Sequence, residues 1–334
     1  MNISLIKCHG SFNDFIMIDE IERAYHFSES DRISLTQTLC DRQTGVGADG
    51  ILFVMPHPEK DAEMRIFNAD GSEATMCGNG LRCVVRLMWE KTDKTSMNIA
   101  VCGLNYPVWK EEDMGEGIIR TSVEIPAVSL EAKDVPIVCA DKQLLEGKLV
   151  SLSKRLSFSG VNMSNSQLVT FVEAIDPTEF REVGYTANTD KEVFPQGINV
   201  NFCKLLSSHS LYVDTYERGV GPTASCGTGM CASTLVGHLL GKLQADGQWI
   251  SVYTRGGLIY TLPTERNGRP VVRLSGNATY CFSGDAELTR TASGGWKYRG
   301  FNQAQSFETE EAAYIEYVEG IKRQLAATPL YLTH

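Results

Sequence analysis

The chain has 334 residues, a formal net charge of −10 and no long basic run. The length suits two domains, and the acidic balance argues against nucleic acid or a membrane surface as a partner, because both attract basic proteins. The N-terminus has a lysine at position 7 and lacks the apolar core of a signal peptide, and no apolar stretch approaches the length of a transmembrane helix. We therefore expect a cytoplasmic protein.

Short strand-like runs recur along the chain, and helical spacing is less frequent. Strands are predicted at residues 1–7, 15–18, 51–55, 63–68, 97–101, 117–124, 169–172, 211–216, 249–253, 258–262 and 271–275. Helices are predicted at residues 30–40, 79–90, 228–241 and 308–325. The alternation of polar and apolar residues in 210–216 suits a half-exposed antiparallel strand. Many strands with two strong helices predict an α+β fold.

The chain contains ten cysteines, scattered along its length. In a reducing cytosol most of them should be free thiols. A free cysteine usually behaves as a small buried hydrophobe. We expect this of Cys8, Cys40, Cys102, Cys139, Cys203 and Cys281.

Two segments share one layout at a large offset. In each, a strand ends at an aromatic residue, a loop of nine residues follows, and Cys-Gly-x-Gly then opens a helix. The aromatic residue and the cysteine are Phe67 and Cys77 in the first copy, and Tyr216 and Cys226 in the second. Two copies predict two similar domains that face each other across a cleft, joined by a linker at residues 126–136.

A Cys-Gly-x-Gly sequence at a helix start suits the binding of a carboxylate. The first turn has backbone N–H groups without intrahelical partners, and the helix dipole adds positive potential. These groups belong to Gly78 and Asn79 in one copy and to Gly227 and Thr228 in the other. The same field favours a thiolate at the cysteine. Two such units predict a racemisation in which one thiolate removes an α-proton and the opposing thiol returns a proton to the other face.

Three other interpretations of these glycine-rich turns were weighed. The spacings Cys77-x5-Cys83 and Cys226-x4-Cys231 differ from zinc knuckles, and no histidine lies near either pair. Neither the Walker A motif nor G-x-G-x-x-G is present, which argues against phosphate. A structural turn would be the best interpretation of one copy alone, but two copies with a cysteine at the same place argue against it.

Long motifs in this sequence resemble those of the diaminopimelate epimerase family. They are Asn68-Ala-Asp-Gly-Ser with Cys77-Gly-Asn-Gly-Leu-Arg-Cys83, Glu217-Arg-Gly-Val-Gly-Pro-Thr with Cys226-Gly-Thr-Gly, His9-Gly-Ser-Phe-Asn13-Asp-Phe, and Gly45-Val-Gly-Ala-Asp-Gly50. The resemblance covers roughly residues 1–290. It implies two pseudo-symmetric domains, each a barrel-like, mostly antiparallel sheet around a central helix, with the active site in the cleft between them.

The resemblance also implies an isomerase that uses no pyridoxal phosphate and no metal, with Cys77 and Cys226 as its acid–base pair. It implies that an amino-acid substrate is bound by further polar residues. Asn68, Asn199 and Arg218 would bind the distal carboxylate, which suits an arginine fork and amide donors. Glu217 would help to hold an ammonium group, and Asn13 and Asn165 would orient the substrate.

The chain departs from the family at Ser164-Asn165-Ser166-Gln167, where Gly-Asn-Pro-His is usual. Glutamine can donate and accept hydrogen bonds but cannot titrate. We expect interconversion of LL- and meso-diaminopimelate, in the route to lysine. The alternatives are a cofactor-independent racemase of another amino acid, such as histidine, and a non-catalytic amino-acid-binding protein, against which the cysteine pair argues.

The expected domains are residues 1–125, completed by 277–290, and residues 126–276. Residues 291–334 are expected to form a C-terminal extension outside the common pattern. Its helix either packs on a neighbouring subunit of a homodimer or caps its own domain, and we favour capping.

Overall fold

The computed structural model describes residues 1–292 and 294–332, which form two compact units. Unit 1 comprises Met1–Val123 and Ser275–Tyr317; unit 2 comprises Glu124–Leu274 and the chain from Val318 onward. The borders predicted from the sequence were 125/126 and 276/277. Among the described residues, no helix is both long and apolar enough to cross a membrane.

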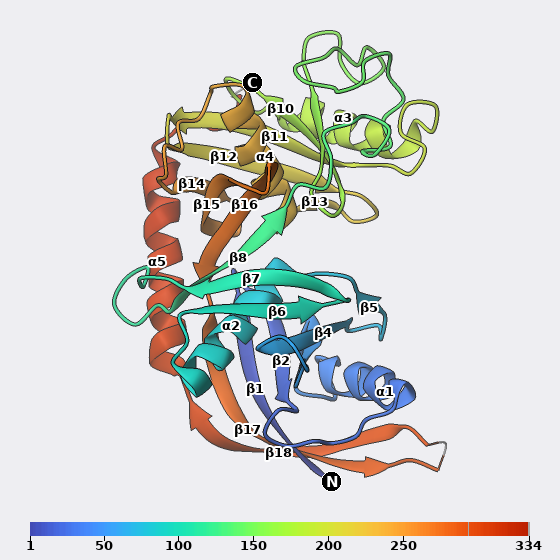
Figure 1. Cartoon of the computed structure of the whole chain (residues 1–334), viewed down its shortest axis with the longest axis vertical. Coiled ribbons are helices and arrows are strands. Elements are labelled where there is room, and N and C mark those ends of the chain that lie inside the picture. Colours follow the sequence, from blue (N-terminus) through green and yellow to red (C-terminus); the bar gives the residue numbers. More distant parts are fainter. Residues whose placement is uncertain (293, 333–334) are drawn as a thin grey trace. The chain divides into compact units, whose positions relative to one another are not determined.

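Unit 1 contains most of the first half of the chain and a late hairpin (Figure 1). Its strands are β1 (Asn2–Gly10), β2 (Asn13–Asp19), β3 (Gly50–Met55), β4 (Ala62–Asn68), β5 (Glu73–Ala74), β6 (Ser96–Val101), β7 (Leu104–Lys110), β17 (Thr279–Arg290) and β18 (Trp296–Ser306). Its helices are α1 (Glu29–Cys40) and α2 (Gly78–Thr92). Ser28 and Asp31 form a capping box at the start of α1.

Unit 2 contains β9 (Ser159–Asn162), β10 (Ser166–Phe171), β11 (Asn199–Ser207), β12 (Ser210–Glu217), β13 (Gly221–Thr223), β14 (Ile250–Thr254), β15 (Gly257–Arg266), α3 (Pro177–Thr189) and α4 (Gly227–Leu239). Three elements have residues in both units: β8 (Arg120–Pro126), β16 (Arg269–Asn277) and α5 (Glu308–Ala326).

The two units repeat one pairing scheme. In unit 1, β2 is parallel to β3, β3 is antiparallel to β4, β4 is parallel to β6, and β6 is antiparallel to β7. In unit 2, β10, β11, β12, β14 and β15 follow the same order with the same directions. The short strands β5 and β13 pair with β4 and β12, immediately before α2 and α4. The α+β fold with two pseudo-symmetric units is therefore confirmed.

A helix lies against the strands of each repeat. Helix α2 contacts β1, β2, β3, β4 and β7, and α4 contacts β9, β10, β11, β12, β14 and β15. The middle of each helix is buried nearly all round, from Gly80 to Met88 and from Gly229 to Gly237. Removing this apolar surface from water holds the helices in place, and it fixes the position of each Cys-Gly-x-Gly turn at the helix start.

Two expectations about the connecting segments were wrong. Residues 126–136 are not a free linker, because Ala127, Ala132 and Val135 are buried and Val128 N–H donates to the Asn162 carbonyl at 2.7 Å. Of the expected extension, residues 291, 292 and 294–332 are described, and they do not lie outside the two units. Strand β18 pairs with β17, and Leu330 packs in the core of unit 2.

The nine-residue loops before Cys77 and Cys226 each contain a short strand that was not predicted, β5 and β13. Strand β12 is not half-exposed, because its polar residues Asp214 and Thr215 are buried. Asp214 accepts hydrogen bonds from Arg255 Nε at 3.0 Å and from the Tyr331 hydroxyl at 2.9 Å. These partners compensate for the cost of taking a carboxylate out of water.

Candidate active site

Cys77 is the N-cap residue of α2 in unit 1, with an extended backbone and no side-chain cap. Its Sγ lies 3.7 Å from Asn13 Oδ1, and Asn79 Nδ2 donates to the same oxygen at 3.4 Å. Asn13 in turn donates to Asp49 Oδ2 at 2.7 Å. Cys77, Asn13 and Asn79 therefore lie together in unit 1.

Asn68 and Gly78 flank this group in the chain. Asn68 is exposed at the end of β4, and its amide donates to Ser72 Oγ at 3.0 Å. Gly78 is the first residue of α2. Among the described residues, no hydrogen bond connects Asn68 to Cys77, so the part of Asn68 in a common site stays a prediction.

Cys226 is the matching N-cap residue of α4 in unit 2, and it is buried. Its Sγ lies 3.6 Å from Thr228 Oγ1, and the Gly229 N–H also points to the sulfur. Glu217, at the end of β12, faces the thiol and receives a hydrogen bond from Thr223 Oγ1 at 2.9 Å. Gly227 lies between Cys226 and Thr228 as the first residue of α4.

Three more predicted residues lie in unit 2. Asn165 Oδ1 accepts a hydrogen bond from Gln167 Nε2 at 2.7 Å. The same nitrogen donates to Thr228 Oγ1 at 3.0 Å, so Gln167 connects Asn165 to Thr228. Asn199 Oδ1 accepts from the Arg218 N–H at 2.8 Å and fixes the backbone there. Arg218 is exposed, in a turn that continues through Gly219 and Val220.

Arg218 lines a hollow of about 460 Å³ together with Lys191, Gln196 and Tyr216. Its Nη1 donates to the Gln196 carbonyl at 3.4 Å. Among residues 1–292 and 294–332, no carboxylate forms an ion pair with Arg218. The guanidinium thus presents unused donors to the hollow, which suits an anionic group of a ligand.

The expectation that the helix starts lower the pKa of these two cysteines was wrong. Burial raises the pKa of Cys77 above its ordinary value, although the N–H groups of Gly80 and Asn79 and the charge of Arg82 act to lower it. Burial and the Glu217 carboxylate raise the pKa of Cys226 to about 12. At both cysteines, desolvation disfavours the charged form more than the nearby hydrogen-bond donors favour it.

The raised pKa makes the alkylation rate of Cys226 strongly dependent on pH. Only the thiolate reacts, so we expect the rate with iodoacetamide to rise about tenfold per pH unit from pH 7 to 10. Glutathione in the same samples should level off earlier, since an ordinary thiol has a pKa of about 8.5. Peptide mass spectrometry measures both rates. A Cys226 rate that levels off near pH 8 would contradict the buried-thiol account.

Two residues near Cys77 had no predicted role. Arg82 is fully buried one turn into α2, donates to the Asn277 carbonyl at 3.0 Å and to Ser11 Oγ at 2.9 Å, and acts on the Cys77 pKa. Asp49 holds the Asn13 amide. Both belong to the quoted motifs, but no spacing rule connects either residue to the cysteine.

The ten cysteines all lie within the described residues, and none of them forms a disulfide. Cys8, Cys40 and Cys203 are buried, as predicted; Cys102 is exposed, and Cys139 and Cys281 are partly exposed, so for these three the prediction was wrong. Cys102 lies in the tight turn between β6 and β7, with φ of 47°.

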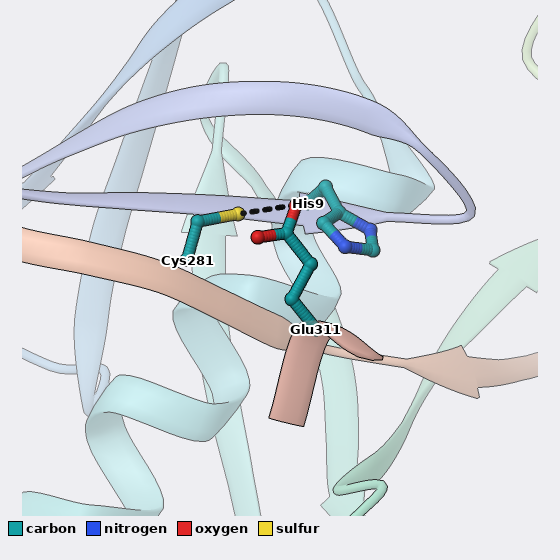
Figure 2. A group of neighbouring side chains, drawn as sticks. All are labelled: His9, Cys281 and Glu311. Carbon is teal, nitrogen blue, oxygen red and sulfur yellow. Dashed lines mark hydrogen bonds between the residues drawn. The ribbon is translucent and has the colours of Figure 1, made fainter. Parts of the chain in front are cut away.

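His9, Cys281 and Glu311 gather in unit 1, each with one potential ligand atom within 4.8 Å of the others. Figure 2 shows the Glu311 carboxylate beside the Cys281 sulfur, at 3.7 Å. However, His9 Nδ1 accepts the Phe12 N–H at 3.3 Å, which assigns the imidazole proton to Nε2. A protonated Nε2 has no lone pair for a metal, so this group is not a preformed ligand set.

Comparison with known proteins identifies the family. A family model described as diaminopimelate epimerase matches residues 5–115 and 159–281. A protein of Clostridium acetobutylicum named diaminopimelate epimerase is 42% identical over 321 residues, which cover 96% of this chain and 95% of that protein. A protein of Enterococcus faecalis with the same name is 36% identical, covering 97% and 100%. The clostridial alignment is long enough to include most of the chain after residue 290.

Solved structures share the fold at low identity. A phenazine biosynthesis protein of the PhzF family from Bacillus anthracis matches with a TM-score of 0.58 and 13% identity, covering 85% of this chain and 99% of that one. A hydroxyproline epimerase from Agrobacterium vitis matches with a TM-score of 0.54 and 14% identity, covering 85% and 92%. The family model and the two relatives, which extend over nearly the whole chain, show that it belongs to the diaminopimelate epimerase family.

Proposed function

We propose that this protein is a diaminopimelate epimerase that interconverts the LL and meso isomers by proton transfer at one α-carbon. The observation that carries the proposal is the repeated geometry: a thiol is the N-cap residue of the buried helix in each unit, and its side chain does not cap the first turn. The relatives named for this activity are 36–42% identical over almost the full chain.

The proposed reaction needs both thiols on one substrate. One sulfur, as thiolate, takes the α-proton, and the electron pair left on carbon is delocalised into the adjacent carboxylate. The N–H groups at the starts of α2 and α4 stabilise the charge that develops on that carboxylate. The other sulfur, as thiol, gives its proton to the opposite face and becomes the thiolate. The two cysteines end in exchanged protonation states.

The electrostatics of Cys226 suit the role of proton donor. Its raised pKa keeps the proton on sulfur at neutral pH, and the nearby Glu217 carboxylate reinforces this. Cys77 has no carboxylate among the causes of its shift, and the positive charge of Arg82 favours its thiolate. We therefore propose that Cys77 is the more readily deprotonated member in the substrate-free protein.

The distal end of the substrate is proposed to bind at Arg218, with Asn199 holding its backbone and Asn68 contributing an amide. Diaminopimelate carries a second carboxylate, whereas lysine and histidine do not. The guanidinium of Arg218 is exposed and pairs with no carboxylate of the described residues, which supports a dicarboxylic substrate over the racemase alternative.

Arg218→Met is expected to lower kcat/KM for diaminopimelate by about 10- to 100-fold, since a charge-assisted hydrogen bond contributes about 1.5–3 kcal/mol. Arg181→Met is the matched control, because Arg181 is an exposed arginine on α3 in the same unit. Turnover of diaminopimelate, histidine and lysine is compared for the unmodified enzyme and the two variants. Faster racemisation of histidine than of diaminopimelate by the unmodified enzyme would move the assignment to the racemase alternative.

A further inference from the structure

A chain of hydrogen bonds lies behind Cys226 and begins at a backbone carbonyl. Asn201 Nδ2 donates to the Leu168 carbonyl at 3.2 Å and to Gln167 Oε1 at 2.9 Å. Gln167 Nε2 donates to Thr228 Oγ1 at 3.0 Å. Thr228 Oγ1 lies 3.6 Å from the Cys226 sulfur. Gln167 and Asn201 are fully buried, so water does not compete for these bonds.

The direction of this chain is fixed. A backbone carbonyl can only accept, so the Asn201 atom facing Leu168 must be its NH₂ group, and the atom of Gln167 facing that group must be oxygen. The NH₂ group of Gln167 then faces Thr228. Asn201 Oδ1 accepts from Thr215 Oγ1 at 2.8 Å, which agrees with this orientation.

The fixed direction of these hydrogen bonds also orients the Thr228 hydroxyl towards the Cys226 sulfur. Because Thr228 Oγ1 already accepts from Gln167, its own proton is free to point at Cys226. A hydroxyl that donates to sulfur favours the thiolate, whereas the Glu217 carboxylate, at the end of β12, opposes it. Gly229 makes the arrangement sterically possible, since a Cβ there would lie 2.3 Å from Asn201 Oδ1.

We propose that Gln167 is a positioning residue: by occupying the acceptor site of Thr228, it directs the Thr228 hydroxyl to Cys226 and keeps this thiol ionisable during turnover. The role of Gln167 in catalysis rests on the proposed two-thiol function. At the position where the family usually has a histidine, the side-chain amide of Gln167 supplies a hydrogen-bond donor that no change of pH removes.

The test is a double-mutant cycle read by alkylation of Cys226 with iodoacetamide at pH 8–10. Thr228→Val should slow alkylation about tenfold, the loss expected for one hydrogen bond to a thiolate. Gln167→Met, which is uncharged and of similar size, should slow it severalfold. In the Thr228→Val background, Gln167→Met should change the rate by less than about twofold, because the two residues act in series.

Alkylation of Cys77 in the same samples is the control, since its contacts lie in unit 1 and should not respond. If Gln167→Met does not fold, Gln167→Glu replaces it in the cycle. Its effect on the alkylation rate of Cys226 is measured with and without Thr228→Val, and the difference between the two effects is the contribution that acts through Thr228. The proposal would be overturned if the Gln167 variant left the alkylation rate of Cys226 unchanged. It would also be overturned if the substitutions at Gln167 and Thr228 slowed alkylation by independent factors.

The readout needs no substrate, so the two proposals fail separately. If the cycle behaves as expected but the protein does not epimerise diaminopimelate, the proposed function falls and the positioning role stands. If epimerisation is observed but the cycle shows independent effects, only the positioning role falls. In the active enzyme, Gln167→Met should also move the pH profile of kcat/KM to higher pH, which a loss of stability alone would not do.

Discussion

Cys77→Ala and Cys226→Ala are each expected to lower the epimerisation rate of diaminopimelate by at least about 10²–10⁴-fold, the usual contribution of a general acid or base. Each variant removes one of two groups that must act in the same turnover, so neither loss can be compensated by the other cysteine. Isomerisation measured by chiral chromatography checks this result.

Cys83→Ala and Cys231→Ala are the matched controls. Both residues lie in the same helices as the site cysteines and are fully buried, and neither is an N-cap residue. Their loss removes a small buried side chain and should reduce stability more than turnover. Near-normal turnover in Cys226→Ala would show that the two-thiol mechanism is wrong.

Arg86→Met is expected to destabilise unit 1 by about 3–5 kcal/mol, as for other broken buried ion pairs. Arg86 is buried on α2 and donates to the Ala278 carbonyl at 2.7 Å, to Glu310 Oε2 at 2.9 Å and to Glu90 at 2.8 Å. Its guanidinium also lies 3.6 Å from the centre of the Tyr280 ring. The substitution leaves the Glu310 carboxylate largely buried without its cation.

Lys94→Met is the matched control in unit 1. Lys94 is paired with Asp61 at 2.6 Å but is largely exposed, so its loss should cost less than about 1 kcal/mol. Urea unfolding followed by tryptophan fluorescence compares the variants, since Trp89, Trp109 and Trp296 all lie in unit 1. Equal unfolding midpoints for Arg86→Met and Lys94→Met would contradict the structural role of Arg86.

The helices that carry the site were predictable because two independent signals agreed. Residues 79–90 and 228–241 combine helical spacing with a glycine-rich start, and the structure has α2 and α4 there. Helix α3 was missed although Asp176 and Pro177 are typical start signals. Its Gly184 weakens the pattern, and the reason for that glycine is tertiary: a Cβ there would lie 2.3 Å from the Tyr216 ring.

Features that depend on burial could not be predicted from the motifs. The start of a helix favours a thiolate, but the sequence does not show how far Cys226 is removed from water, and desolvation sets the sign of its pKa shift. The contact of Gln167 with Thr228 joins residues 61 positions apart, which no local spacing predicts.

The central claim is tested most directly by the source of the proton on the product. LL-diaminopimelate is converted in D₂O, and the early product and the remaining substrate are separated and analysed by mass spectrometry. Two thiols on opposite faces predict that the meso product carries one solvent deuteron at the inverted carbon while the remaining LL substrate stays unlabelled. A product that retains the original proton would contradict the two-thiol account, because it would mean that a single group both removes and returns it.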